Sequence, residues 1–153
     1  MITGGAQAIF DRFGVRREAQ LERLFAENDV IVELEALTPQ TVGMVDAGLL
    51  GCIPQGGVFV NVGRGKVVDQ AALIELAKAG QVAIGLDVYA EEPLAADSPL
   101  RGLENVFLTP HTAGPTPDGY PILGRYALDN VRAYLEGRPL KSVIGLPEYD
   151  RIT

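Results

Sequence analysis

Three ionisable side chains, Arg64, Glu92 and His111, have the clearest chemical use in this sequence. Arg64 stands between two glycines in the polar stretch 61–69, which directly follows the apolar run 58–60. The planar guanidinium of an arginine can hold a carboxylate through two charge-assisted hydrogen bonds. The alternative is a solvated arginine on the surface of a loop, and the stretch alone is compatible with both.

His111 is the only histidine of the chain, and it follows closely after the apolar run 106–108. Histidine is the natural proton donor or acceptor at neutral pH, because its ordinary pKa lies near neutrality. A carboxylate such as Glu92 that reaches the far ring nitrogen would fix the tautomer and favour the imidazolium. The alternatives are a turn histidine that hydrogen-bonds its own loop and a solvated glutamate beside Glu91.

Asp87 lies near the end of the run 82–88, which is apolar on both alternations before it. A strand with two apolar faces belongs in the middle of a parallel sheet that is covered by helices. A carboxylate at the end of such a strand costs free energy unless it has a partner. We therefore expect a helix-covered sheet and a specific partner for Asp87.

Hydrophobic periodicity and turn residues predict helices and strands that alternate along the chain. Asp69 is placed to cap one helix and Gly80 to end it. Residues 1–15 are expected to form a loop or frayed edge, and residues 138–153 an extended tail. The predicted helices cover 16–27, 45–50, 70–79 and 120–136, and the predicted strands cover 30–34, 58–62, 82–88 and 106–109.

This order of elements predicts an α/β fold with a parallel sheet, helices over it and right-handed crossovers. In such a sheet, ligands bind outside the carboxyl ends of the strands. The turns 34–39, 62–65, 87–92 and 109–114 should open on that one edge. We expect these four polar turns to line a single crevice.

The composition suits one globular domain, because 153 residues with 47% hydrophobic content and a mean hydropathy of +0.14 can bury a core. The net charge of -7 argues against nucleic acid or an anionic membrane as the main partner. The single cysteine, Cys52, excludes an internal disulfide, offers no metal cluster and is expected to be buried. Nothing resembles a signal peptide or a membrane span of ~20 apolar residues, so a cytoplasmic protein is expected.

Four strings resemble the D-isomer-specific 2-hydroxyacid dehydrogenases, a family that includes phosphoglycerate, glycerate, lactate and formate dehydrogenases. They are Leu-Thr-Pro-Gln-Thr at 37–41, Val-Asn-Val-Gly-Arg-Gly-Lys-Val-Val-Asp at 60–69, Gly-Leu-Asp-Val-Tyr-Ala-Glu-Glu-Pro at 85–93 and Asn-Val-Phe-Leu-Thr-Pro-His at 105–111. The resemblance covers roughly 21–137, with the strings in the family's order. A single string would be a weak signal, whereas four in order are a strong one.

The resemblance implies an oxidoreductase that transfers a hydride between NAD or NADP and a D-2-hydroxy acid or 2-keto acid. Arg64 would clamp the carboxylate of the substrate and polarise its carbonyl. His111 would give a proton to the substrate oxygen or remove it, and Glu92 would hold His111. Asp87 would meet the nicotinamide carboxamide.

The resemblance also implies a partial Rossmann-like sheet and further contacts with the cofactor. Val62, Gly63 and Arg64 would approach the cofactor through their backbone, and His111 to Gly114 would flank the nicotinamide. A further cofactor contact is implied near Glu35, in the turn after the first predicted strand. Leu34 and Ala36 stand there where the family often has a histidine and a proline.

The family's Gly-x-Gly-x-x-Gly fingerprint and the acidic residue about 20 positions after it are absent from the sequence. We therefore expect residues 1–153 to be a single, truncated cofactor domain that binds NAD(H) or NADP(H) weakly and has little activity alone. A homodimer is a further expectation, since relatives commonly dimerise through this domain. The rival hypotheses are a non-enzymatic dinucleotide-sensing or protein-interaction module on the same fold and a partial gene product without activity.

Overall fold

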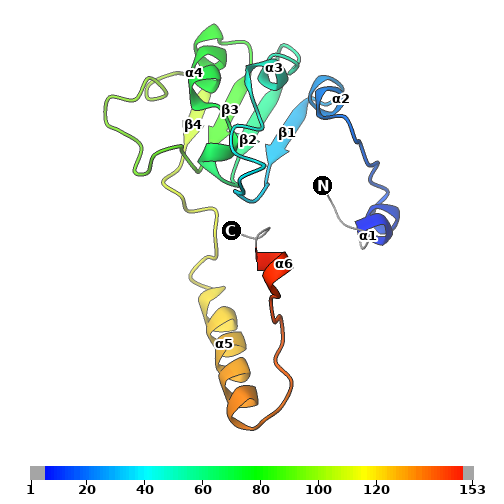
Figure 1. Ribbon diagram of the computed structural model, residues 1–153. Helices are drawn as coiled ribbons and strands as arrows, with labels where there is room; N and C mark the ends of the chain where they lie inside the picture. Colours follow the sequence, from blue (N-terminus) through cyan, green and yellow to red (C-terminus); the bar gives the residue numbers. More distant parts are fainter. Residues whose placement is uncertain (1–5, 150–153) are drawn as a thin grey trace.

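Four parallel strands form the sheet of the protein in a computed structural model that describes residues 6–149. The strands lie in the order β1-β2-β3-β4, as Figure 1 shows. Their register aligns Ile31, Phe59, Ile84 and Val106 across the sheet. The parallel α/β fold predicted from the sequence is confirmed. The strands are β1 (Val30–Glu33), β2 (Val58–Asn61), β3 (Ala83–Leu86) and β4 (Val106–Leu108).

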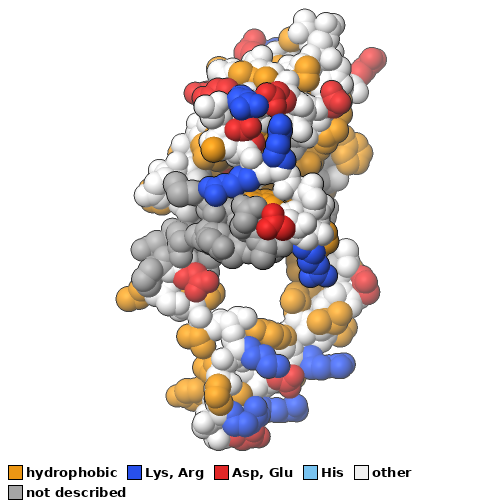
Figure 2. Space-filling view, turned by 90° about the vertical axis from the view of Figure 1, so that its right-hand side faces the viewer, with side chains coloured by type: hydrophobic (Ala, Val, Ile, Leu, Met, Phe, Trp, Pro, Cys, Tyr) orange, Lys and Arg blue, Asp and Glu red, His pale blue; other side chains and the backbone are white. Residues whose placement is uncertain are grey.

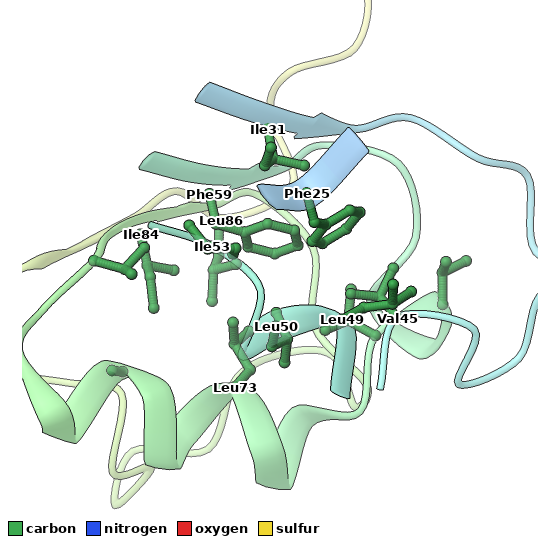
Figure 3. Close-up of a cluster of buried hydrophobic side chains, with 14 of the residues drawn as sticks. Phe25, Ile31, Val45, Leu49, Leu50, Ile53, Phe59, Leu73, Ile84 and Leu86 are labelled. Atoms are coloured by element: carbon green, nitrogen blue, oxygen red, sulfur yellow. The ribbon is translucent and has the colours of Figure 1, made fainter. Parts of the chain in front are cut away.

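One face of the sheet carries the core, which Figure 3 shows between the strands and three helices. These helices are α2 (Leu21–Ala26), α3 (Ala47–Leu50) and α4 (Gln70–Ala79). Phe59 on β2 is fully buried, and its ring lies 6.3 Å from that of Phe25 on α2. This burial of apolar side chains is the main source of stability for the sheet.

The opposite face of the sheet is open over much of its area. Val30 and Val32 of β1 alternate with buried residues, and Phe107 of β4, which lies between two partly buried residues, is 71% exposed. The expectation of a sheet covered by helices is therefore right for only one face. The three helices that contribute to the core lie on the same side of the sheet, so within residues 6–149 the strand residues of the other alternation have no helix against them.

Helix α4 begins and ends where the sequence predicts. The carboxylate of Asp69 accepts hydrogen bonds from the amides of Ala71 at 2.9 Å and Ala72 at 3.2 Å, which caps the helix. Gly80 ends it with a φ of +69°, a left-handed conformation that glycine adopts without strain. A short 3-10 helix, η1 (Gly65–Val67), joins the turn after β2 to this cap.

Several local predictions are wrong at the ends of the chain. Helix α1 (Ala6–Phe13) lies where a loop or frayed edge was expected, and α6 (Leu146–Tyr149) interrupts the tail expected to be extended. Helix α2 begins at Leu21 rather than at residue 16. Just before the helix, the Glu18 carboxylate accepts hydrogen bonds from the backbone amides of residues 19 and 20, which favours a turn there over a helix. The predictions for residues 1–5 and 150–153 lie outside the described residues.

Cys52 is partly rather than fully buried, since it lies just after α3 at the margin of the core. Its thiol donates to the carbonyl of Gly48 at 3.3 Å. The expectation of a buried cysteine is therefore wrong in degree.

Helix α5 (Tyr120–Leu135) extends away from the sheet beyond the linker 109–119, as Figure 1 shows. Most of its apolar residues are exposed, among them Ile122 and Tyr134, although Ala133 is buried, and hydrophobic side chains colour this arm of the molecule in Figure 2. The Asn130 amide exchanges two hydrogen bonds with the backbone of Lys141, which ties the following segment to the helix. Within residues 6–149, no helix is long and apolar enough to cross a membrane.

Candidate active site

Glu92 and His111 meet at the carboxyl edge of the sheet. Glu92 lies in the loop after β3 and His111 in the loop after β4, and Nδ1 of His111 is 2.7 Å from Oε2 of Glu92. The hydrogen bond to His111 and the backbone amide of Tyr89 lower the pKa of the Glu92 carboxyl. The pair therefore combines an ionised carboxylate with an imidazole whose Nε2 atom is left for another partner.

His111 adopts a φ of +54°, in the left-handed region that residues with a side chain seldom occupy. Its side chain is 49% exposed and borders a cavity of about 450 Å³ together with Glu92, Tyr89 and Arg101. The unusual backbone conformation turns the chain sharply after β4. Such strained positions cluster at functional sites, so the geometry is an independent sign that this turn has a function.

Asp87 finds its partners in the turn after β4. Its Oδ1 atom accepts from the Thr109 hydroxyl at 2.5 Å and from the Thr112 amide at 2.8 Å, and Oδ2 accepts from the Ala113 amide at 2.8 Å. Burial raises the pKa of this carboxyl, but these hydrogen bonds and the nearby His111 outweigh burial and hold the pKa below its ordinary value. Asp87 is thus ionised, and it anchors the turn that carries His111.

The turn that carries Arg64 is held by the side chain of Asn61, which is 1% exposed. The Asn61 Oδ1 atom accepts from the Gly63 amide at 3.0 Å, and its Nδ2 donates to the Arg64 carbonyl at 3.3 Å. The Arg64 side chain is exposed, and its Nη1 donates to the Gly63 carbonyl at 2.8 Å. Among the described residues, no hydrogen bond joins this guanidinium to Glu92 or His111.

Two glycines allow this turn to lie between its neighbours. A Cβ on Gly65 would lie 2.0 Å from the carbonyl carbon of Tyr89, in the turn after β3. A Cβ on Gly63 would lie 2.6 Å from a carboxylate oxygen of Glu33 and 3.1 Å from the Glu35 carbonyl, in the turn after β1. The backbone around Arg64 is therefore packed against the turns that follow both adjacent strands.

The other predicted cofactor contacts are spread along the same edge. Val62 and Asp87 border a second cavity of about 270 Å³, together with Thr112 and Ala113. Glu35 is exposed beside the turn of Gly63, and its amide donates to Glu33. Gly114 is exposed, with no atom within 4 Å of the place a Cβ would occupy. The structure thus brings Val62 and Asp87 together and places Glu35 and Gly114 toward the two ends of the edge.

Three residues that shape this site were not singled out from the sequence: Asn61, Tyr89 and Thr109. Each lies within one of the motif strings, at most two positions from a residue that was singled out. Asn61 was the easiest to find, because an amide side chain at the end of an apolar strand needs hydrogen-bond partners. The roles of Tyr89 and Thr109 depend on contacts 20 and 22 residues away in sequence.

Glu33 was also missed, and its carboxyl is the most poorly satisfied group near the site. The residue is 6% exposed, its Oε1 atom accepts from the Glu35 amide at 2.5 Å, and its Oε2 has no hydrogen-bond partner among residues 6–149. Burial raises the pKa of this carboxyl, and the nearby backbone amides of Glu35 and Arg64, with a smaller effect of the Arg64 charge, offset that only in part. The ionised form of Glu33 therefore costs free energy in the folded protein.

The substitution Glu33→Gln should stabilise the chain at neutral pH by about 1 kcal/mol, because it removes a buried charge and keeps an acceptor for the Glu35 amide. A folded-state pKa above the unfolded value means that stability falls as the pH rises through that interval. In the variant, this decrease in stability with rising pH should be absent, as urea unfolding between pH 4 and pH 8 would reveal. Glu104→Gln, on an exposed side chain, serves as the control, and equal pH profiles for both variants would contradict the prediction.

Comparison with known proteins agrees with this geometry. Residues 3–113 match the sequence profile of the D-isomer specific 2-hydroxyacid dehydrogenase, NAD binding domain. D-3-phosphoglycerate dehydrogenase of Archaeoglobus fulgidus is 35% identical over 141 residues, which are 92% of this chain and 27% of that protein. Glyoxylate/hydroxypyruvate reductase B of Serratia proteamaculans is 41% identical over 127 residues, which are 82% of this chain and 39% of that protein.

Solved structures give the same result. A D-isomer specific 2-hydroxyacid dehydrogenase from Xanthobacter autotrophicus Py2, in complex with NADPH and MES, matches 83% of this chain and 41% of its own, with a TM-score of 0.73 and 35% identity. D-mandelate dehydrogenase of Rhodotorula graminis matches 95% of this chain and 42% of its own, with a TM-score of 0.84 and 26% identity. The chain spans less than half the length of these relatives, and it belongs to the D-isomer specific 2-hydroxyacid dehydrogenase family, within the NAD-binding domain.

Proposed function

We propose that this chain carries the nicotinamide side of a dehydrogenase site, in which a hydride passes between NAD or NADP and a D-2-hydroxy acid or 2-keto acid. The observation that carries the proposal is the hydrogen bond of 2.7 Å between Glu92 and His111. It lies at the sheet edge where the turn of Arg64 and the carboxylate of Asp87 also lie. An ionised carboxylate, an imidazole and an arginine together suit a reaction that moves a proton on an acidic substrate.

The cavity beside Asp87 fits the nicotinamide end of the cofactor. Val60, Val62 and Phe107 give it an apolar wall for a flat ring, and among the described residues Asp87 Oδ2 accepts one hydrogen bond, from Ala113. That oxygen can therefore accept a second from a carboxamide N–H. When bound there, the cofactor supplies the hydride chemistry, and the protein supplies position and charge.

His111 would exchange the proton with the substrate oxygen. Because its Nδ1 faces Glu92, its Nε2 is the atom left to donate to a carbonyl oxygen or to accept from a hydroxyl. Glu92 fixes the orientation of the ring and, through the hydrogen bond at Nδ1, its tautomer. The 450 Å³ cavity that both residues border is open to a small acid.

Arg64 would bind the carboxylate of the substrate. Its Nη1 donates to the Gly63 carbonyl, and its Nε and Nη2 make no hydrogen bond to the described residues. An exposed guanidinium with free N–H groups can take a carboxylate and polarise the adjacent carbonyl. Relatives named glyoxylate/hydroxypyruvate reductases make small 2-keto acids the first substrates to test.

Nuclear magnetic resonance can test the proposal on the chain itself, because His111 is its only histidine. NADH or NADPH should shift the amide signals of Thr112 and Ala113 beside Asp87. Glyoxylate added to that complex should then shift the imidazole signals of His111. Arg64→Ala should abolish the glyoxylate effect and leave the cofactor effect in place, with Arg138→Ala, which lies beyond α5, as the matched control.

The cofactor affinity should be weak, with a dissociation constant above about 1 μM, because the sequence contains no Gly-x-Gly-x-x-Gly turn to bind the pyrophosphate at a helix N-terminus. Fluorescence titration of NADH would measure it, and submicromolar affinity would contradict this part of the proposal. If millimolar NADH and NADPH shift no amide signal in the turn beside Asp87, the whole proposed function is contradicted.

A second candidate function, a protein-interaction module, has one observation in its favour. The open face of the sheet and the exposed residues of α5 present apolar surface that suits a protein contact, including a homodimer. The close pairing of Glu92 and His111 favours the enzyme, since a binding module has no need of an oriented imidazole.

A further inference from the structure

Tyr89 contacts all three segments that carry the proposed catalytic groups. Its backbone amide donates to Oε1 of Glu92 at 3.0 Å. Its hydroxyl donates to the Thr109 carbonyl at 2.7 Å, two residues before His111. Its carbonyl group is the part of the chain that closely faces Gly65, next to Arg64.

The hydroxyl of Tyr89 is held firmly in this position. The residue is 8% exposed, and its ring belongs to the hydrophobic core. The same hydroxyl lies 3.3 Å from the Leu86 carbonyl at the end of β3. Burial raises the pKa of the phenol, so it remains a hydrogen-bond donor throughout the pH range in which enzymes work.

The contact between the Glu92 and His111 side chains is, by contrast, exposed and weak by itself. Their side chains are 35% and 49% exposed, and they come from different loops. Exposed ion pairs contribute about 0–1 kcal/mol, so the pair by itself is too weak to fix the distance between its two loops. Asp87 anchors the turn of His111 but makes no hydrogen bond to Glu92 among the described residues, so a buried tie that also reaches the loop of Glu92 would hold the two side chains together.

We propose that Tyr89 is a positioning residue that keeps Glu92 and His111 in register, with its amide on one loop and its hydroxyl on the other. The proposal rests on the proposed dehydrogenase function for its catalytic meaning, whereas its structural content stands on the contacts above. Displacing a catalytic group by about 1 Å can lower the rate a hundredfold. The loss of such a tie should therefore affect turnover more than binding.

The ring and the hydroxyl of Tyr89 make separable contributions. Tyr89→Phe keeps the ring in the core and removes only the contacts of the hydroxyl, the short one to the Thr109 carbonyl and the longer one to the Leu86 carbonyl. Tyr89→Leu also removes much of the ring volume and is expected to destabilise the fold. Tyr126→Phe is the matched control, because it deletes a phenol hydroxyl that bonds to Ser142 in the exposed region of α5.

Carbon-13 spectra of the glutamate carboxyl groups, with Glu92 assigned by Glu92→Gln, would test the proposal on the chain without cofactor. In Tyr89→Phe the pKa of Glu92 should rise toward the ordinary value for glutamate, because its hydrogen bond with His111 is made less often. Nitrogen-15 shifts of the single histidine should show a mixture of ring tautomers. Tyr126→Phe should match the original chain in both measurements.

An unchanged Glu92 titration and an unchanged His111 tautomer in Tyr89→Phe would overturn the proposal, even if Tyr89→Leu unfolds. Where the chain or a longer parent protein reduces a 2-keto acid, Tyr89→Phe should lower kcat about tenfold and leave KM for the acid near its original value. If the chain fails to bind cofactor, the proposed function fails while the carboxyl and tautomer measurements still decide the role of Tyr89.

Discussion

Replacing Gly65 by alanine should destabilise the chain by about 3 kcal/mol and displace the turn of Arg64. The new Cβ would lie 2.0 Å from the carbonyl carbon and 2.1 Å from the carbonyl oxygen of Tyr89. Both are backbone atoms, which cannot rotate away as a side chain does, so one of the two turns must move. Urea unfolding would measure the loss, and the amide spectra of the turns after β2 and β3 would show the displacement.

Gly124→Ala gives a control with the opposite sign. Gly124 lies inside α5, and apart from its neighbours in the helix no described atom lies within 4 Å of the place where its Cβ would be. Alanine there should stabilise the helix by up to about 1 kcal/mol, because glycine is the poorer helix former. If Gly65→Ala were as stable as the original chain, the close packing of the Arg64 and Tyr89 turns would be refuted.

Replacing Asp87 by alanine should have a comparable effect, with a loss of about 2–4 kcal/mol at neutral pH. Asp87 is 3% exposed, and its removal leaves the Thr109 hydroxyl and the amides of Thr112 and Ala113 without their acceptor. Unsatisfied buried donors cost about 1–3 kcal/mol each, and part of this is regained where water enters. The turn that carries His111 should become mobile, as amide hydrogen exchange would show.

The effect of Asp87 should depend on pH in a definite direction. Its pKa in the folded protein is below the ordinary value of 3.8, so its contribution is complete above that value and is lost as the pH falls through the folded pKa. The difference in stability between the original chain and Asp87→Ala should therefore narrow in acid. Asp129→Ala, on an exposed pair with Arg132, should change stability by less than about 1 kcal/mol. If the difference in stability between the original chain and Asp87→Ala does not vary with pH, an ionised Asp87 is excluded as the anchor of the turn.

Local sequence patterns predicted the elements with long or well-marked signals. The strands and helix α4 were recognised because an apolar run or periodic face was bounded by residues such as Asp69 and Gly80, whose roles depend on near neighbours. Short helices were missed or misplaced, as α1 and α6 show. One or two turns give too few apolar positions to define a period, so contacts elsewhere decide whether they form.

The sequence by itself determined that Arg64, Asp87, Glu92 and His111 lie at one edge, because the carboxyl ends of parallel strands share that edge. It also marked Asp87 as a carboxylate in need of a partner. Only the tertiary structure decided that the partners are Thr109, Thr112 and Ala113, and that Tyr89 links the separate loops. These contacts join residues about 20 or more positions apart, and such pairings follow from strand order and packing rather than from any local pattern. The open face of the sheet was decided in the same way, because the residues of its strands are apolar on both sides whether or not a helix lies against them.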